Sequence, residues 1–290
     1  MASQLVPLRE VERLSSNVIR ILGGNPGKFT LQGTNTYLIG TGRSRLLIDT
    51  GEGKPAWIAS LKDTLQKENA TVGQAVITHW HHDHTGGIKH LLEYSPSTII
   101  YKHQPSDGQE DIEDGQQFKV EGASLQTVYS PGHTQDHMAL VLENEDAMFT
   151  GDNVLGHGTA VFEDLYAYIK SLNRMKGAFK GRAYPGHGPV IDDGPSKIVE
   201  YIKHRQMRED QVVQILKTAR EVGSDEASGS DPHEWTSMEI VKLIYKDVPE
   251  NLHLPANGGI TQILLKLQEE DKVVENLKTD RWSLKNRAAL

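Results

Sequence analysis

The run His79-Trp80-His81-His82-Asp83-His84 constrains the fold of this chain more than any other feature. A β-branched apolar run directly precedes it and predicts a strand that leads into the histidines. His79 and His81 are two positions apart, so they can converge on one metal ion only from an extended or loop backbone. Asp83 and His84 then lie on the next turn, where they can face a second ion. The sequence therefore predicts a metal site at the end of a buried strand.

Three further candidate ligands occur later in the chain, each beside glycine and after an apolar run. They are His133 in Ser130-Pro-Gly-His-Thr, Asp152 in Thr150-Gly-Asp-Asn, and His187 in Pro185-Gly-His-Gly. Glycine lets the backbone turn sharply, so each ligand is expected at the edge of a sheet. Imidazoles and carboxylates without thiolates suit zinc, and manganese and iron accept the same ligands.

The composition excludes several classes of function. The chain of 290 residues has no cysteine, which removes disulfides, thiolate ligands and a cysteine nucleophile, and leaves 13 histidines for metal binding. Its net charge of -8 means that the chain as a whole does not attract a polyanion such as a nucleic acid. No segment reaches the roughly 18 to 20 apolar residues that cross a bilayer, and the first ten residues do not show the charged and apolar regions expected of a signal peptide. We expect a cytoplasmic protein without membrane partners; Arg9, Arg13 and Arg20 indicate mitochondrial import only weakly.

Residues 1–195 have the texture of one α/β domain, with short β-branched runs between glycine, proline and asparagine turns. Apolar residues at helical spacing predict helices at Trp57–Glu68 and Phe162–Lys176. The predicted strands are Val18–Leu22, Thr36–Ile39, Arg45–Asp49, Ala75–Thr78, Thr98–Tyr101, Leu125–Tyr129, Met138–Leu142 and Ala147–Thr150.

Residues 196–290 form a second predicted domain that is richer in long polar helices. After a helix at Ser196–Arg220 and a linker at Gly223–Pro232, the pattern predicts two helices and a two-stranded ribbon, at Ser237–Tyr245, Gly259–Glu269, Lys272–Leu277 and Arg281–Leu284. This order resembles a winged-helix module. The second of these helices carries Lys266 against Glu269 and Glu270, so a structural or substrate-covering role is as consistent with it as nucleic-acid binding.

The full set of motifs resembles the signature of the metallo-β-lactamase superfamily: His-x-His-x-Asp-His, then Gly-His, Gly-Asp and Gly-His-Gly, over residues 15–195. The resemblance implies an αββα sandwich with metals at the sheet edges. It also implies that Asp49, at the end of a predicted strand, orients ligands. By position, it assigns His79, His81 and His133 to a first zinc ion, Asp83, His84 and His187 to a second, and Asp152 to a bridge between them.

The chemistry that follows is hydrolysis with two zinc ions per chain. Two divalent ions that share a water lower its pKa towards neutrality, so that a hydroxide can attack the substrate, and they polarise the electrophilic oxygen. Asp83 is placed to take or pass the proton, which predicts an acid/base role for it.

Four segments narrow the resemblance, namely Thr30–Tyr37, Thr78–His84, Phe162–Leu165 and Tyr184–Val190. They are similar to the branch that contains the animal mitochondrial β-lactamase-like endoribonuclease and the fungal thioesterases that release polyketides from acyl carrier protein. The stretches Ile100–Gly115 and Ala147–His157 resemble the fungal members and indicate a fungal source.

We therefore expect hydrolysis of an acyl thioester, with an acyl carrier protein as partner. Thioester cleavage needs a hydroxide, oxyanion stabilisation and a cleft, and the acidic balance gives no help to phosphate binding. The first alternative is a metal-dependent endoribonuclease acting on single-stranded RNA. A glyoxalase II-like thioester hydrolase ranks third, and a metal-stabilised, non-catalytic binding module remains as a further alternative.

Five more polar residues near the motifs have weaker predictions. His82 alternates away from the ligands and is expected to be exposed. His137 either supports the loop of His133 or faces the substrate, and His157 can line the cleft. Asn35 and Tyr37 lie in the turn-rich segment before a predicted strand and can reach the substrate from there.

Overall fold

The structure is a computed structural model that describes residues 5–219 and 231–285. The chain divides into two compact units. Unit 1 comprises Met1–Phe162 and Ala167–Tyr201, and unit 2 comprises Glu163–Tyr166 and Ile202–Leu290. We describe each unit by itself.

The first sheet of unit 1 has six strands in the order β1-β2-β3-β4-β5-β6. The strands are β1 (Val11–Arg13), β2 (Val18–Leu22), β3 (Asn35–Ile39), β4 (Ser44–Ile48), β5 (Thr71–Ile77) and β6 (Ile99–Lys102). Pairing is antiparallel from β1 to β4 and parallel from β4 to β6. The carboxyl ends of β4 and β5 therefore meet at one edge, where Asp49 and the histidine run begin.

The second sheet has five strands in the order β11-β10-β9-β8-β7. They are β7 (Gln117–Val120), β8 (Ala123–Tyr129), β9 (Met138–Leu142), β10 (Ala147–Gly151) and β11 (Ala183–Pro185), and a short 3-10 helix, η1 (Glu143–Glu145), joins β9 to β10. Only β10 and β11 pair in parallel. Asp152 follows β10 and His187 follows β11, so both reach the same edge of this sheet.

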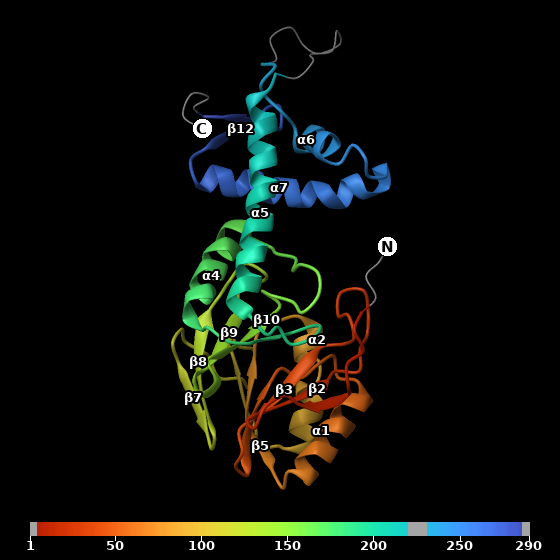
Figure 1. Ribbon diagram of the computed structural model, residues 1–290, viewed down its shortest axis with the longest axis vertical. Helices are drawn as coiled ribbons and strands as arrows, with labels where there is room; N and C mark the ends of the chain where they lie inside the picture. The colour runs from red at the N-terminus through yellow and green to blue at the C-terminus, as the bar shows by residue number, and fades with distance from the viewer. Residues whose placement is uncertain (1–4, 220–230, 286–290) are drawn as a thin grey trace. The chain divides into compact units, whose positions relative to one another are not determined.

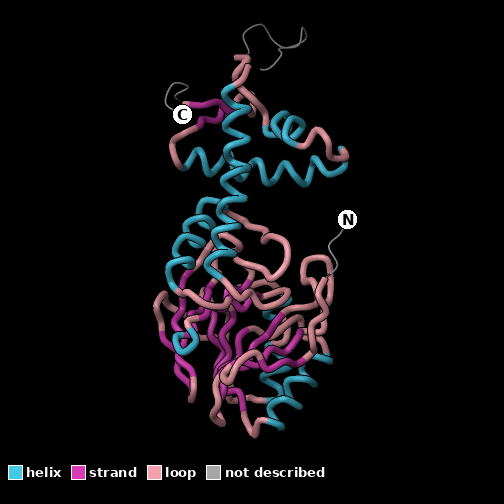
Figure 2. The backbone as a smooth tube through the Cα atoms, viewed as in Figure 1, coloured by secondary structure: helices cyan, strands magenta, loops and turns pink. Residues whose placement is uncertain are grey.

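The two sheets pack face to face around a continuous apolar core, as the neighbouring strands in Figures 1 and 2 show. Ile39, Ile48 and Val76 of the first sheet meet Leu140 and Phe149 of the second in that core.

Helices cover the outer sides of both sheets. Helices α1 (Pro55–Lys67) and α3 (Ile88–Tyr94) bury Trp57, Leu61 and Leu91 against the outer face of the first sheet. Helix α4 (Leu165–Ala178) lies beside the second sheet (Figure 1), with Leu172 and Met175 fully buried. The predicted αββα sandwich is confirmed.

The structure adds elements that the sequence pattern did not predict. Strands β1 and β11 have three residues each, too few for a periodic signal, and β7 alternates exposed and buried positions over only four residues. The histidine run itself continues into the one-turn helix α2 (His82–Thr85), and α3 follows it closely.

Unit 2 contains most of helix α5 (Gly194–Lys217), then α6 (Ser237–Ile244), the 3-10 helix η2 (Glu250–Leu252), α7 (His253–Glu269) and the ribbon of β12 (Val273–Asn276) with β13 (Arg281–Leu284). Thr236 begins α6 through a capping box with Glu239. Ile240, Leu264 and Trp282 are buried in its core. Most of the predicted linker, residues 223–230, lies outside the described residues.

The charged residue that sequence analysis noted on α7 is not available at its surface. Lys266 is 6% exposed, and its Nζ donates to Glu209 Oε2 and Glu270 Oε1, at 2.6 Å each.

None of the helices in the described parts of the chain is long and apolar enough to span a membrane.

Candidate metal centre

Strand β5 and helix α2 place the histidine run at the sheet edge. His79 follows the end of β5 and is fully buried, and the chain then turns into α2, where the backbone N–H groups of His84 and Thr85 donate to the carbonyl of His81. This turn brings Asp83 and His84 back towards His79. His82 is exposed, as expected.

One donor cluster contains His79, His81, His133 and Asp152. Nε2 of His79 and Nε2 of His133 lie 3.0 and 3.1 Å from Nδ1 of His81. Asp152 Oδ2 is 3.7 Å from His133 Nε2. The other ring nitrogen of His133 donates to the carbonyl of Val161 at 2.8 Å, which fixes the ring with Nε2 towards the cluster.

A second cluster contains Asp83, His84 and His187. Nε2 of His187 lies 3.2 Å from Asp83 Oδ2 and also 3.2 Å from Asp152 Oδ2. Nε2 of His84 is 3.4 Å from Asp83 Oδ2 and from Asp152 Oδ1. Asp152 therefore contacts both clusters, and all seven sequence-predicted ligands are brought together.

The donor set fits two metal ions. Nε2 of His84 and Oδ1 of Asp152 are buried and lie 3.4 Å apart, and neither atom has a partner in good hydrogen-bond geometry, although buried polar atoms normally have one. A neutral nitrogen and a carboxylate oxygen at such a position are ligands that zinc accepts.

The carboxylates and imidazoles perturb each other strongly. Burial alone would lower the pKa of His187, but Asp152 and Asp83 raise this pKa to about 9. Burial also opposes charge on His84, yet Asp49 and Asp152 raise its pKa well above 6.5. Burial would raise the pKa of Asp83, but the close contacts of its Oδ2 with His187 and His84 hold this pKa far below its usual value. The cluster thus keeps its carboxylates ionised.

Asp49 orients His84 from the far side of the ring. Its Oδ2 accepts from His84 Nδ1 at 2.8 Å, which leaves Nε2 of that ring to face the cluster. Thr78 anchors the carboxylate by donating from its backbone N–H to Oδ1 and from its hydroxyl to Oδ2, at 2.8 and 2.9 Å. The contact is the one expected of a residue that supports a ligand.

His137 is fully buried behind the clusters, which excludes contact with substrate. Nδ1 of its ring is 2.9 Å from Ser130 Oγ, and its Nε2 accepts from the backbone N–H of Asp152. Burial lowers the pKa of His137 well below 6.5, so the ring is neutral and can accept that bond. Of the two roles left open by the sequence, support of the site is the one that its geometry allows.

Asn35 and Tyr37 also support the site instead of lining it. Asn35 Nδ2 donates to the carbonyls of Pro185 and Gly188 at 2.8 Å, and the Tyr37 hydroxyl donates to Pro185 at 2.6 Å. Both side chains are buried. The expectation of substrate contact was wrong for both, because β3 directs them towards the loop that carries His187.

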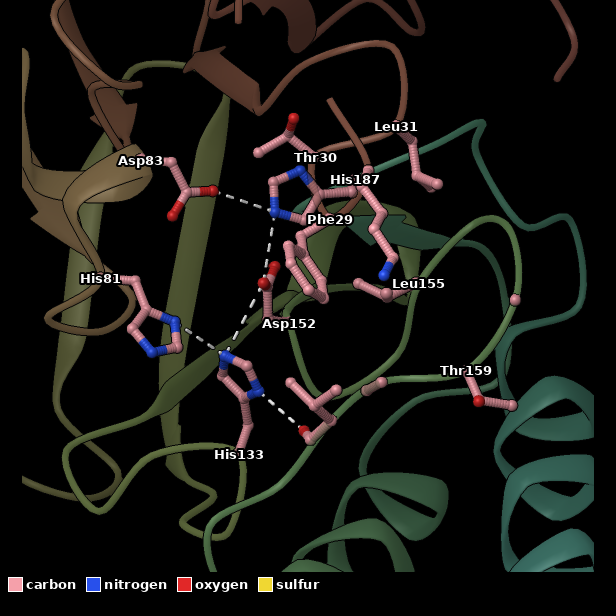
Figure 3. A pocket seen from close by; sticks show the side chains of 14 residues that line it. Phe29, Thr30, Leu31, His81, Asp83, His133, Asp152, Leu155, Thr159 and His187 are labelled. Atoms are coloured by element: carbon pink, nitrogen blue, oxygen red, sulfur yellow. Dashed lines mark hydrogen bonds and ion pairs between the residues drawn. The ribbon is translucent and has the colours of Figure 1, made fainter. Parts of the chain in front are cut away.

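A cavity of about 320 Å³ opens over the two clusters (Figure 3). His81, Asp83, His133, Asp152 and His187 form its polar floor. The rest of its wall comes from two loops, one between β2 and β3 and one between β10 and α4. These loops contribute Lys28, Phe29, Thr30, Leu31, Leu155, Gly158, Thr159, Ala160 and Val161.

The sequence did not identify these wall residues, and two of them are conspicuously exposed. Phe29 is 72% exposed and Val161 is 61% exposed. The only available signal was the turn-rich character of Gly23–Tyr37, which indicates a loop without saying which side chains face the cavity. His157 is not among the lining residues, whereas its neighbour Gly158 is.

Comparison with known families agrees with this architecture. The sequence model described as "Metallo-beta-lactamase superfamily" matches residues 29–105 and 101–187. The model described as "Beta-lactamase associated winged helix domain" matches residues 236–282, which confirms the winged-helix prediction for the tail.

Curated relatives cover nearly the whole chain. A "Lactamase-like protein aptB" of Emericella nidulans is 47% identical over 265 residues, which are 91% of this chain and 84% of that protein. An "Atrochrysone carboxyl ACP thioesterase" of Aspergillus chevalieri is 46% identical over 285 residues, 97% of this chain and 91% of that protein.

Two solved structures share the fold at low sequence identity. A β-lactamase domain protein of Burkholderia ambifaria has a TM-score of 0.76 at 16% identity, covering 98% of this chain and 96% of that one. A metallo-β-lactamase family protein of Thermus thermophilus has a TM-score of 0.69 at 19% identity, covering 94% of this chain and 100% of that one.

Proposed function

Because this chain belongs to the metallo-β-lactamase superfamily, we propose that it is a dinuclear zinc thioesterase that releases a polyketide or another acyl chain from an acyl carrier protein. The observation that carries the proposal is the cavity in Figure 3, which joins both donor clusters to an apolar wall.

The residues that would hold zinc are those of the two clusters. His79, His81 and His133 offer three nitrogens to one ion, and Asp83, His84 and His187 offer their donors to the other, with Asp152 between them. When bound there, two zinc ions would lower the pKa of a water molecule and polarise the thioester carbonyl.

Asp83 is proposed as the acid/base residue. Thr34 Oγ1, His84 Nε2 and His187 Nε2 all contact its Oδ2, so Oδ1 is the oxygen that can receive a proton. The side chain is partly exposed and lines the cavity, where it can accept a proton from the attacking water and return it to the leaving thiolate, which departs as the thiol.

The apolar wall supports an acyl substrate. Apolar side chains line the cavity around its polar floor and can exclude water from a bound acyl group. They belong to Phe29, Leu31, Leu155, Ala160 and Val161. The relative from Aspergillus chevalieri is named as an atrochrysone carboxyl ACP thioesterase. The same chemistry is consistent with this site.

Cleavage of single-stranded RNA is supported less well. Nonspecific strand binding depends on a row of cations that contacts successive phosphates. Among the described residues, Lys28 is the one cation besides the histidines of the floor that lines the cavity. On α7, Lys266 is buried and already paired with two carboxylates. A non-catalytic binding module is disfavoured by the complete donor set with Asp83 in place.

The test is a parallel assay of the full-length, zinc-loaded protein on an acyl thioester, an acyl carrier protein loaded with the same acyl group, and single-stranded RNA. Asp83→Ala should lower thioester turnover by about 10²- to 10⁴-fold. Asp63→Ala changes an exposed aspartate of α1 and should behave as wild type. RNA cleavage that Asp83→Ala abolishes, without thioester turnover by the wild type, would overturn the proposal.

A further inference from the structure

The cavity contains one side chain whose charge the proposed reaction does not use. Lys28 lines the cavity from the loop between β2 and β3 and is exposed to solvent. Its Nζ lies 5.4 Å from the centroid of the Phe29 ring. Within the described parts of the chain, no carboxylate forms an ion pair with it, whereas Lys67, for example, is paired with Asp63 at 2.6 Å.

The Lys28 amine is a positive charge that remains available to an anionic ligand in an otherwise acidic protein. The chain as a whole carries a net charge of -8, so an anionic ligand gains nothing from the overall field of the protein. The two carboxylates of the cavity, Asp83 and Asp152, are committed to the donor clusters. Lys28 is therefore left to interact with whatever occupies the cavity.

The size of the cavity indicates where that anion lies. At about 320 Å³ it is near the lower end of the roughly 300 to 1,000 Å³ typical of small-molecule sites, so it suits a compact acyl group. The phosphate of a pantetheine arm is at the opposite end of the arm from the thioester and falls outside a cavity of this size. The acyl group itself is then the part of the substrate that meets Lys28.

We propose that the substrate is a compact acyl thioester whose acyl group carries an anionic substituent such as a carboxylate, and that Lys28 selects it. The carbon skeleton packs against Phe29, Leu155 and Val161, and the substituent pairs with the Lys28 amine. This inference rests on the proposed thioesterase function and deepens it. A single lysine suffices for one anionic substituent but not for a nucleic-acid strand.

The kinetic test uses two N-acetylcysteamine thioesters of equal size, 4-carboxybenzoyl and 4-carbamoylbenzoyl, which lack phosphate. The zinc-loaded wild type should prefer the acid. Lys28→Met should lower kcat/KM for the acid by about three- to fivefold, in the range of a solvent-exposed charge pair, and change that for the amide less than about 1.5-fold. Lys28→Arg should retain the preference. Lys89→Met, on the exposed face of α3, is the matched control.

A binding measurement separates this inference from the proposed reaction. The corresponding inert thioethers, 4-carboxybenzyl and 4-carbamoylbenzyl, should bind the zinc-loaded protein with the same Lys28-dependent preference in calorimetry. Thioester turnover without any preference for the acid would overturn the role of Lys28 and leave the thioesterase proposal intact. An equal loss of kcat/KM for both substrates in Lys28→Met would have the same meaning. A Lys28-dependent preference in thioether binding without thioester turnover would support Lys28 and contradict the thioesterase.

Discussion

The backbone N–H of Asp152 donates to Nε2 of His137 across 3.2 Å, and the ring that accepts this bond is fully buried. A Cβ added at Gly151 would lie 2.5 Å from the same nitrogen, so the ring packs tightly under the turn that presents Asp152. His137 thereby fixes the backbone of the residue that contacts both donor clusters.

Removal of this support should weaken zinc binding in a folded protein. We expect His137→Phe, which keeps an aromatic ring but removes the acceptor, to lower zinc affinity by about 10- to 100-fold, as is typical for residues that orient ligands. Competition with a chromophoric chelator measures the affinity, and circular dichroism confirms folding. His82→Phe, at an exposed position, should leave the affinity unchanged. Equal affinities of the folded His137→Phe variant and the wild type would contradict the role of His137.

His187→Ala should empty one zinc position preferentially. His187 belongs to the cluster with Asp83 and His84, whereas His79, His81 and His133 remain intact in the variant. Elemental analysis after dialysis should give about one zinc per chain instead of two, and cobalt substitution should keep the absorption of the remaining site. Loss of both metals together would show that the two positions do not fill independently.

Asp49→Ala should act through His84. The change removes the acceptor of the His84 Nδ1–H at a buried position, so we expect a loss in the free energy of unfolding of about 1 to 3 kcal/mol in the metal-free protein. Zinc affinity should fall as well, because the ring is free to turn. Denaturant melts and chelator competition test the two effects, and an unchanged free energy of unfolding would argue against the hydrogen bond.

Zinc affinity should rise with pH up to about 9. In the metal-free protein the pKa of His187 is raised to about 9, so below that pH zinc must displace a proton from this ring. Each displaced proton contributes about a tenfold rise in apparent affinity per pH unit. A flat affinity between pH 7 and 9, measured by competition in buffers of constant ionic strength, would contradict this assignment.

The raised pKa of His187 also predicts how the stability of the metal-free protein depends on pH. Stability should fall as the pH rises, whereas zinc affinity should increase. A pKa raised from 6.5 to about 9 in the folded state stabilises it fully below pH 6.5, and this contribution is lost as the pH rises through 9. Thermal melts of the metal-free wild type should therefore show a decreasing Tm over this range, and His187→Ala should flatten that part of the profile.

The fold and the polar floor were predictable because their signals are local. Strand periodicity and glycine turns predicted the main strands, and the spacing of the histidine run predicted convergence on metal ions. The support of Asp152 by His137 was not predictable, because it joins a side chain and a backbone N–H that are 15 positions apart. The residues of the cavity wall were not predicted for a similar reason. Phe29 and Val161 lie in irregular loops, where side-chain directions follow no sequence period.

Each donor cluster draws on both sheets. His79 and His81 follow β5 of the first sheet, while His133 and Asp152 follow β8 and β10 of the second; Asp83 and His84 likewise face His187 across the sandwich. A bound ion would therefore act as a cross-link between the layers, and opening of the sandwich would require its release. By mass action, a higher free zinc concentration would then slow amide hydrogen exchange in unit 1. Unit 1 would open as one cooperative unit whose stability depends on the zinc concentration.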